Sequence, residues 1–198
     1  ARRCRVRLDR IHLDRDAGGI GIPVVVAGPK RGPAARSRYA TFLEVPDLYR
    51  STTEWAPALC EWGAGQSLRP VLFASEDAAL LAAEKHHNAL AKQFVKPYPA
   101  PDVVLNVIDK RRLYEAAERL GVGVPRSREV TDADDLEGLA ASGWLVKPSV
   151  RYRLDEEGGI TTFLQATGAT KAIGGDPTRA VREVLAAGFP AILQEAVP

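Results

Sequence analysis

Two lysines have the surroundings that a polyphosphate site needs. Lys110 follows Asp109 at the start of a predicted helix, and Lys147 ends an apolar run directly before a proline. Two ammonium groups supplied by separate elements suit a polyphosphate, because such a site depends on charge more than on the fork geometry of arginine. The helix start adds backbone N–H donors beside Lys110. Lys147 is the stronger candidate, since a lysine ending a buried strand is costly without an anionic partner.

The residue pattern leaves open that both are ordinary solvated lysines. Their positions depend on two elements, of which the first is residues 107–125, VIDKRRLYEAAERLGVGVP. It predicts a strand end, a helix capped by Asp109 and a Gly-Val-Gly-Val-Pro exit that stops the helix. The second element is the short strand WLVKPS, Trp144–Ser149. Helical spacing predicts that one face of the helix is apolar, with these members: Leu113, Tyr114, Ala117 and Leu120.

The length, charge and composition of the chain argue against several classes of function. The chain has 198 residues, enough for one good core or two small ones. A net charge of +2 argues against a dedicated binder of nucleic acid or anionic membrane. No apolar run reaches membrane-spanning length, and the N-terminus is too charged for a signal peptide. Cys4 and Cys60 have no zinc-site spacing. These features predict a cytoplasmic protein with free thiols, with a disulfide between the two cysteines as the alternative, and they leave its oligomeric state open.

Residues 1–106 predict a Rossmann-like parallel sheet, because apolar runs alternate with helical patterns. A half-buried strand is predicted around Val6. The helix after Ser51 begins with a capping box, Ser51-x-x-Glu54, and the helix predicted from Ser75 runs to about Phe94. The glycine-rich loop around Lys30 lacks phosphate-loop spacing, so a structural connection is favoured. The predicted strands of this half are residues 22–27, 41–45, 70–74 and 103–107.

Residues 107–198 predict a second, mixed unit. After Trp144–Ser149 come a charged stretch, residues 151–157, and Gly158-Gly159. The charged stretch fits a mobile lid or an exposed hairpin. Helices are predicted from Thr131 to Gly143 and after an Asp176 cap with Pro177 at the first position. Further strands are predicted at 160–164, 170–173 and 191–197.

Asp109-Lys110, a helix ending LGVGVP, then LVKP and LQE in that order resemble the ATP-grasp superfamily. Within it, the chain is most similar to the predicted carboxylate–amine ligase group, which includes relatives of D-aspartate ligase and D-alanine–D-alanine ligase. The resemblance runs from about Ile20 to the end. It implies a Rossmann-like pre-ATP-grasp domain at residues 1–106 and the first part of an ATP-grasp domain at 107–198. The absence of methionine and the ends at Ala1 and Pro198 indicate an N-terminal fragment.

The resemblance also implies roles for individual residues. Lys110 and Lys147 would contact ATP phosphates, and Lys171 would face them; as residues alone, Lys171 equally fits a solvated strand lysine. The segment Gln194–Val197 would hold the adenine through backbone groups. The implied ATP-binding set is Lys110, Lys147, Ser149, Lys171, Gln194, Glu195 and Val197. Glu195 equally fits an exposed strand residue. Arg38 is a candidate for binding a substrate carboxylate, although its RSRY context fits a charged surface loop better.

The reaction implied for the complete enzyme joins a small-molecule carboxylate and an amine through an acyl phosphate, with ATP and Mg²⁺. The magnesium ligands and catalytic residues are expected beyond Pro198, so the fragment alone is expected to be inactive. After Lys147 the sequence departs from the family, because only Gly158-Gly159 replaces the usual glycine-rich loop. Two other functions stay open: a non-catalytic nucleotide-binding module or degenerate ATP-grasp paralogue, and a plain Rossmann-like protein.

Overall fold

The structure is a computed structural model, and it describes residues 5–7, 17–29, 36–132, 136, 144–163 and 177–196. It divides into two compact units, Ala1–Pro101 with Leu154–Ile160, and Asp102–Arg153 with Thr161–Pro198. The domain boundary expected at 106/107 stays a prediction.

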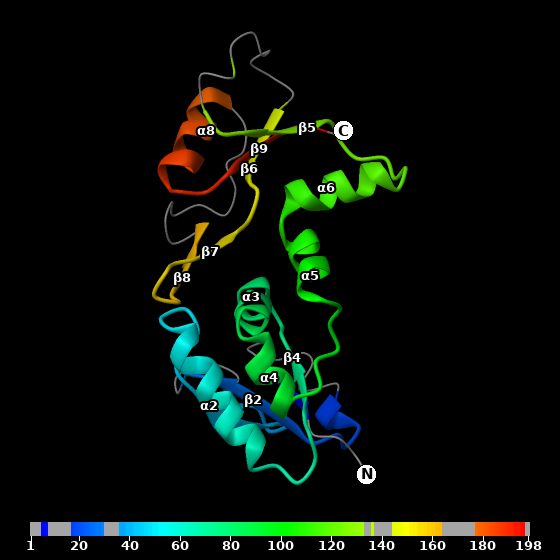
Figure 1. The fold of residues 1–198 in the computed structure, drawn as a ribbon, viewed down its shortest axis with the longest axis vertical. Helices are drawn as coiled ribbons and strands as arrows, with labels where there is room; N and C mark the ends of the chain where they lie inside the picture. Colours follow the sequence, from blue (N-terminus) through cyan, green and yellow to red (C-terminus); the bar gives the residue numbers. More distant parts are fainter. Residues whose placement is uncertain are drawn as a thin grey trace. The chain divides into compact units, whose positions relative to one another are not determined.

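A parallel four-stranded sheet forms the centre of the first unit (Figure 1), in the order β3-β2-β1-β4. Its strands are β1 Arg5–Arg7, β2 Val24–Gly28, β3 Thr41–Glu44 and β4 Val71–Phe73. All neighbouring strands run parallel. Val24 to Ala27 are buried, as a strand inside a parallel sheet requires. The Rossmann-like parallel sheet predicted from the sequence is therefore confirmed.

The helices of this unit are α2 Thr52–Ala64, α3 Asp77–Lys85 and α4 His87–Gln93. The Ser51 hydroxyl caps α2 by accepting from the Glu54 backbone N–H, as predicted. Trp55 and Leu59 of α2 are fully buried. Gly63 lies against the Phe94 ring, where an added Cβ would meet a ring carbon at 2.9 Å. Glycine at this position therefore allows α2 to approach the end of α4.

The single helix predicted from Ser75 to Phe94 is wrong in two respects. It is two helices that part at His86, and the N-cap of the first is Glu76 without a side-chain cap. Ser75 Oγ is buried without a hydrogen-bond partner. At the break, the Lys96 ammonium bonds the Ala83 carbonyl at 3.4 Å. A carbonyl engaged by a side chain in this way weakens the regular helical ladder, which gives a physical reason for the division.

The strand predicted at residues 103–107 is also wrong, because this segment is helix α5, Pro101–Ile108. Its buried residues, Val104 and Ile108, are four positions apart, which is helical spacing. Proline at the first position and an acid in the first turn both favour a helix start. The β-branched valines suggested a strand, but their local preference is weak beside these helix signals and tertiary packing.

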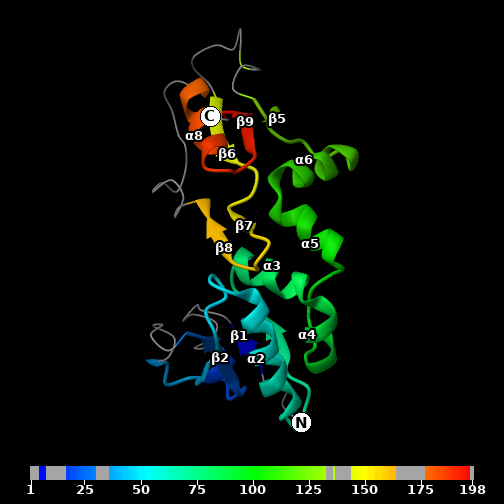
Figure 2. The same ribbon diagram turned by 60° about the vertical axis from the view of Figure 1, so that its left-hand side comes forward.

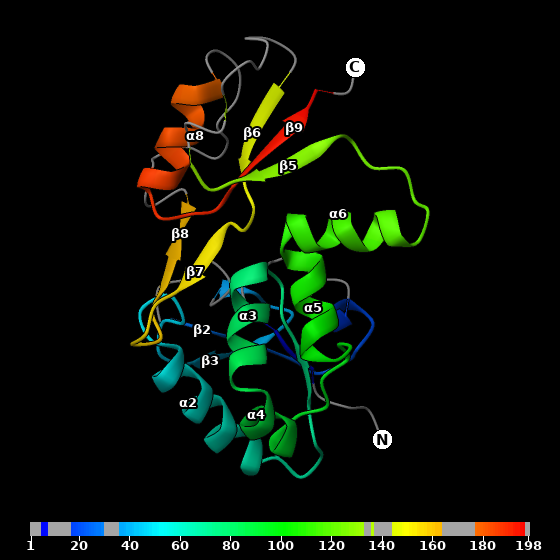
Figure 3. The same cartoon turned by 45° about the horizontal axis from the view of Figure 1, so that its top comes forward.

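The second unit contains a three-stranded antiparallel sheet in the order β5-β9-β6. Its strands are β5 Ser127–Val130, β6 Trp144–Pro148 and β9 Ala191–Glu195, and its further helices are α6 Lys110–Arg119 and α8 Pro177–Ala186. Figure 2 shows α8 beside β6 and β9, and Figure 3 shows the three strands side by side. Val146 and Leu193 pack with Val181 and Val184 of α8 in one buried cluster.

Two shorter strands, β7 Tyr152–Leu154 and β8 Ile160–Thr162, pair with each other. Of the two alternatives predicted for the charged stretch, a mobile lid or an exposed hairpin, the structure has the strand pair of a hairpin. Its turn belongs to the first unit, where the Gly158 carbonyl accepts from the Thr52 backbone N–H at 2.8 Å. Most of the helix predicted at 131–143, the strand at 170–173 and the Asp176 cap lie outside the described residues. Among the helices that are described, none has the length and apolar character of a membrane span.

Candidate functional site

The antiparallel sheet of the second unit has two chemically different faces. Side chains alternate between faces along a strand, and directly paired residues share a face. Val146 pairs with Leu193 on the face that packs against α8. Lys147 pairs with Ile192, so both point to the opposite face. By the same registers, Gln194 and Glu129 also belong to that opposite face, which we call the polar face.

Lys147 has a defined partner on the polar face. Its Nζ donates to Gln194 Oε1 at 2.9 Å, and the Tyr114 hydroxyl donates to the same oxygen at 3.0 Å. Gln194 is buried, with 7% of its surface exposed, whereas Lys147 and Tyr114 are half-buried. The structure therefore brings together two residues of the predicted nucleotide site, and it adds Tyr114. Sequence reasoning had assigned Tyr114 only to an apolar helix face.

Lys110 lies at the same end of strand β6. Its Nζ donates to the carbonyls of Pro148 and Ser149, both at 3.3 Å, and its backbone N–H donates to the Ser149 carbonyl at 3.1 Å. Pro148 is the residue that follows Lys147. Both predicted phosphate-binding lysines therefore lie at the C-terminal end of β6. Lys147 is part of the strand, and Lys110 contacts it from the start of α6.

Asp109 and Ser149 form the junction between α6 and that strand end. Asp109 Oδ1 caps α6 by accepting from the Arg111 backbone N–H at 2.9 Å, as predicted. The same oxygen accepts from the Ser149 hydroxyl. Ser149 is 1% exposed, and its backbone N–H donates to the Pro190 carbonyl at 2.8 Å. A phosphate at this hydroxyl would have to compete with Asp109, so the role proposed for Ser149 in binding ATP stays a prediction.

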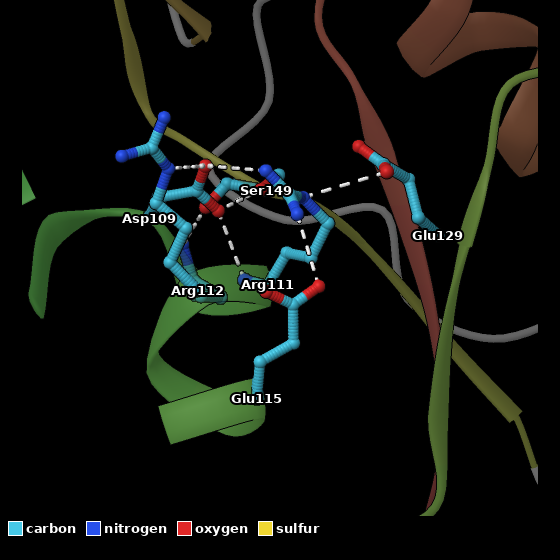
Figure 4. A network of polar contacts seen from close by, with 7 residues as sticks. Asp109, Arg111, Arg112, Glu115, Glu129 and Ser149 are labelled. Atoms are coloured by element: carbon cyan, nitrogen blue, oxygen red, sulfur yellow. Dashed lines mark hydrogen bonds and ion pairs between the residues drawn. The ribbon is translucent and has the colours of Figure 1, made fainter. Parts of the chain in front are cut away.

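Charged side chains connect the start of α6 to strand β5 (Figure 4). Arg111 contacts Glu115 at 2.9 Å and Glu129 at 3.4 Å, and Arg112 contacts Asp109 at 3.7 Å. The hydrogen bond that Arg111 donates to Glu115, with the charges of Glu115, Glu129 and Asp109, raises the pKa of Arg111. The Arg111–Glu115 pair could be recognised from its helical spacing of four residues. Glu129 could not, because only the fold brings β5 to α6.

Helix α6 is present as predicted, and its apolar face is not buried. Its residues 110–119 are helical and none of them is buried. Leu113 is 38% exposed and Leu120, directly after the helix, is 80% exposed. The described contacts of Asp109, Arg111 and Tyr114 are polar, and they reach Glu129 of β5, Gln194 of β9 and Ser149, which directly follows β6.

At the C-terminal end of β9, Glu195 forms hydrogen bonds with the backbone of Arg126. Glu195 Oε1 accepts from the Arg126 backbone N–H at 2.9 Å, and the Glu195 backbone N–H donates to the Arg126 carbonyl at 2.9 Å. The Glu195 backbone N–H and carboxylate already have protein partners, so an adenine would have to use other groups of the segment. Ala196 is exposed, while Val197 and Lys171 lie outside the described residues.

Arg38 belongs to the first unit. It lines an open cleft of about 380 Å³ with Gly18, Gly21 and the starts of β2 and β3. Its guanidinium lies 4.8 Å from the centre of the Tyr39 ring and donates to the Tyr39 hydroxyl. Its proposed role in binding a substrate carboxylate stays a prediction. In the described part of the chain, no three His, Cys, Asp or Glu side chains are grouped to hold a metal ion.

Comparison with known proteins adds evidence on the fold. No family model matches the chain, and no curated protein matches its sequence. Among solved structures, L-amino acid ligase from Bacillus licheniformis matches with a TM-score of 0.69 at 14% identity, over 98% of this chain and 44% of that protein.

Two further similar proteins were solved with a nucleotide bound. N5-carboxyaminoimidazole synthetase from Staphylococcus aureus complexed with ADP matches with a TM-score of 0.63 at 14% identity, over 98% of this chain and 48% of that one. The corresponding Aspergillus clavatus synthase, in complex with ADP and 5-aminoimidazole ribonucleotide, matches with a TM-score of 0.61 at 15% identity, over 98% and 46%.

These structural neighbours are ATP-grasp ligases, and the chain spans less than half of their length. The chain has the α/β fold of their N-terminal part. The fold expected from the sequence motifs is therefore confirmed.

Proposed function

We propose that the chain is the N-terminal part of an ATP-dependent carboxylate–amine ligase, and that Lys147 and Lys110 bind the phosphates of ATP. In this proposal residues 1–106 are the pre-ATP-grasp domain and residues 107–198 begin the ATP-grasp domain. The observation that carries it is the convergence of both lysines on the end of β6, where Lys110 bonds the carbonyl next to Lys147. The shared fold with ATP-grasp ligases supports the same conclusion.

The electrostatics of the strand end fit a polyanion. Lys147 is held by a neutral amide, and Lys110 by backbone carbonyls, in the hydrogen bonds found for their ammonium groups. The hydrogen bond to a neutral amide does not cancel the charge of the Lys147 ammonium group. A positive charge on a half-buried surface attracts phosphate more strongly than it would in bulk water, because the effective dielectric constant is lower there.

For the complete enzyme, the proposed reaction has two steps. A carboxylate oxygen of the first substrate attacks the γ-phosphorus of ATP, the bond from that phosphorus to the bridging oxygen breaks, and ADP leaves with an acyl phosphate formed. The nitrogen of an amine then attacks the acyl carbon, phosphate leaves, and an amide results. In these steps Lys147 and Lys110 hold and orient phosphate oxygens, which is an electrostatic and positional contribution.

The test is nucleotide binding by Lys147→Ala, with Lys92→Ala as the matched control. Lys92 is an exposed lysine of α4 in the first unit, so its removal costs the same formal charge. Titration of ADP into the chain should show affinity reduced about tenfold or more for Lys147→Ala, by loss of a charge-assisted contact. Lys92→Ala should match the wild type. Equal ADP affinity for all three proteins would contradict the assignment.

A non-catalytic nucleotide-binding module is the second candidate. The turn after Lys147 favours it, since both glycine N–H groups that could bind a phosphate are engaged within the first unit: the Gly159 N–H donates to Asp155 Oδ1 at 2.6 Å and the Gly158 N–H to the Asp155 carbonyl at 3.3 Å. These two glycines therefore have protein partners in place of a ligand. ADP release in the presence of candidate carboxylates and amines, measured on the full-length protein, separates an enzyme from a module. A nucleotide that binds and is never turned over supports the module.

A further inference from the structure

The oxygen of the Gln194 side chain accepts two hydrogen bonds at once. Lys147 Nζ lies 2.9 Å from Oε1 and the Tyr114 hydroxyl lies 3.0 Å from the same atom. An amide oxygen has two lone pairs, so both are used. Because Gln194 is only 7% exposed, water has little access to replace either donor. The amide is therefore fixed with its oxygen towards Lys147.

A buried lysine of the first unit differs from Lys147 because its partner is charged. Lys96 in the first unit lies 2.8 Å from Glu84 Oε1, and both side chains are at most 5% exposed. Its charge is offset by a carboxylate, so that pair is structural. In the described part of the chain Lys147 forms no ion pair, and the partner found for it is neutral. A neutral acceptor restricts the ammonium group without cancelling its charge.

We propose that Gln194 and Tyr114 are positioning residues for Lys147: Gln194 orients the ammonium group, and Tyr114 fixes Gln194 from α6. This inference rests on the proposed function, in which Lys147 binds phosphate. It assigns to Tyr114 a role in the nucleotide site through two hydrogen bonds in series. It also makes the direction of the Lys147 side chain depend on the position of the N-terminal half of α6.

The three hydrogen-bonded residues come from three separate elements, so the tertiary structure brings them together. Lys147 is on β6, Gln194 on β9 and Tyr114 on α6. No residue of α6 is buried, so Tyr114 is not an apolar anchor with an incidental hydroxyl. Two contacts hold the start of α6 in place, one turn before Tyr114. Asp109 bonds Ser149, and Arg111 contacts Glu129.

The first experiment needs no nucleotide. The chain, Tyr114→Phe and Gln194→Ala would be treated with a limiting amine-acetylating reagent, and the rate at each lysine followed by mass spectrometry. Loss of a typical hydrogen bond changes an equilibrium about two- to tenfold, so acetylation of Lys147 should accelerate by that factor in both variants. Lys92 should keep its rate and serves as the internal control.

Tyr39→Phe is the matched control variant, because it removes a tyrosine hydroxyl that bonds Arg38 in the first unit. It should leave the Lys147 rate unchanged. An unchanged Lys147 rate in both Tyr114→Phe and Gln194→Ala would overturn the positioning role. A circular dichroism spectrum equal to that of the wild type would show that the variants are folded.

The second experiment titrates ADP into the same proteins. Tyr114→Phe should weaken ADP binding about two- to tenfold, by the same hydrogen-bond argument. If the wild-type chain binds no ADP, the proposed function fails, while the acetylation rates still decide the positioning role. If ADP binds and Tyr114→Phe equals the wild type in both measurements, the positioning role fails and the proposed function stands.

Discussion

Helices α2 and α6 begin alike and are held in place by different forces. Both have a side-chain cap, Ser51 on the Glu54 N–H and Asp109 on the Arg111 N–H. Beyond the cap, α2 buries Trp55 completely within its unit, whereas α6 buries none of its residues. The described attachments of α6 are hydrogen bonds and ion pairs.

The difference separates stability from positioning. Apolar burial contributes about 25 cal/mol per Å² and is little affected by salt. Exposed ion pairs contribute about 0–1 kcal/mol and are screened, but they define direction and partner. Helix α2 therefore stabilises the first unit, and α6 orients Lys110 and Tyr114 at the end of β6. Four predictions test this division, from the largest effect to the smallest.

Leu59→Ala in α2 should lower the free energy of unfolding by about 2–5 kcal/mol, because a buried side chain is lost and a cavity remains. Leu113→Ala in α6 removes the same atoms from a side chain that is 38% exposed, and should cost about 0.5 kcal/mol or less. Urea denaturation followed by circular dichroism measures both. Similar losses in the two variants would show that α6 is packed as α2 is.

Asp109→Ala should destabilise the second unit by about 1–2 kcal/mol, the range for a lost cap with additional partners. Asp109 also accepts from the Ser149 hydroxyl and contacts Arg112. Ser51→Ala in α2 loses the cap, so its cost should be smaller, about 1 kcal/mol. Hydrogen exchange of the amides in each helix reports the two effects separately. A larger loss of protection for Ser51→Ala would contradict the prediction.

Stability should fall at alkaline pH through Tyr98 in the first unit. Burial, with the charge of Glu84, raises the pKa of Tyr98 to about 12, although the Ala74 N–H lowers it. The folded state therefore retains a proton that the unfolded chain loses near pH 10. This contribution should be complete below pH 10 and should decline as the pH rises towards 12. Thermal unfolding of Tyr98→Phe should show less of that decline; an identical pH profile would rule Tyr98 out.

Arg111→Ala should have the smallest effect on stability, below about 1 kcal/mol, because its ion pairs are partly exposed. The cost should shrink further at 1 M salt, where the screening length is about 3 Å. Arg179→Ala is the matched control, since Arg179 forms a comparable pair with Glu183 at 3.0 Å on α8. Urea denaturation at two salt concentrations measures the change in the free energy of unfolding. A loss that does not depend on salt would contradict the prediction and would indicate that Arg111 contributes mainly by packing.

Local patterns determined much of the fold. The continuous apolar run around Val25 predicted a buried parallel strand, and Ser51 and Asp109 predicted helix starts. These signals act between residues a few positions apart, so the sequence contains them directly. The motifs also led to the ATP-grasp fold and to Lys110 and Lys147. Where local signals conflicted, as in residues 103–107, the prediction of a strand was wrong.

Only the tertiary structure decided what the candidate site residues contact. Gln194 follows Lys147 by 47 residues, and Tyr114 precedes Gln194 by 80. Such pairs depend on strand register and helix placement, which no short-range pattern encodes. The same holds for the apolar face of α6: its sequence set the periodicity of the face, while the packing of the whole chain determined that it stays unburied in the described structure. Helical spacing arises from the local backbone, but burial requires a second surface.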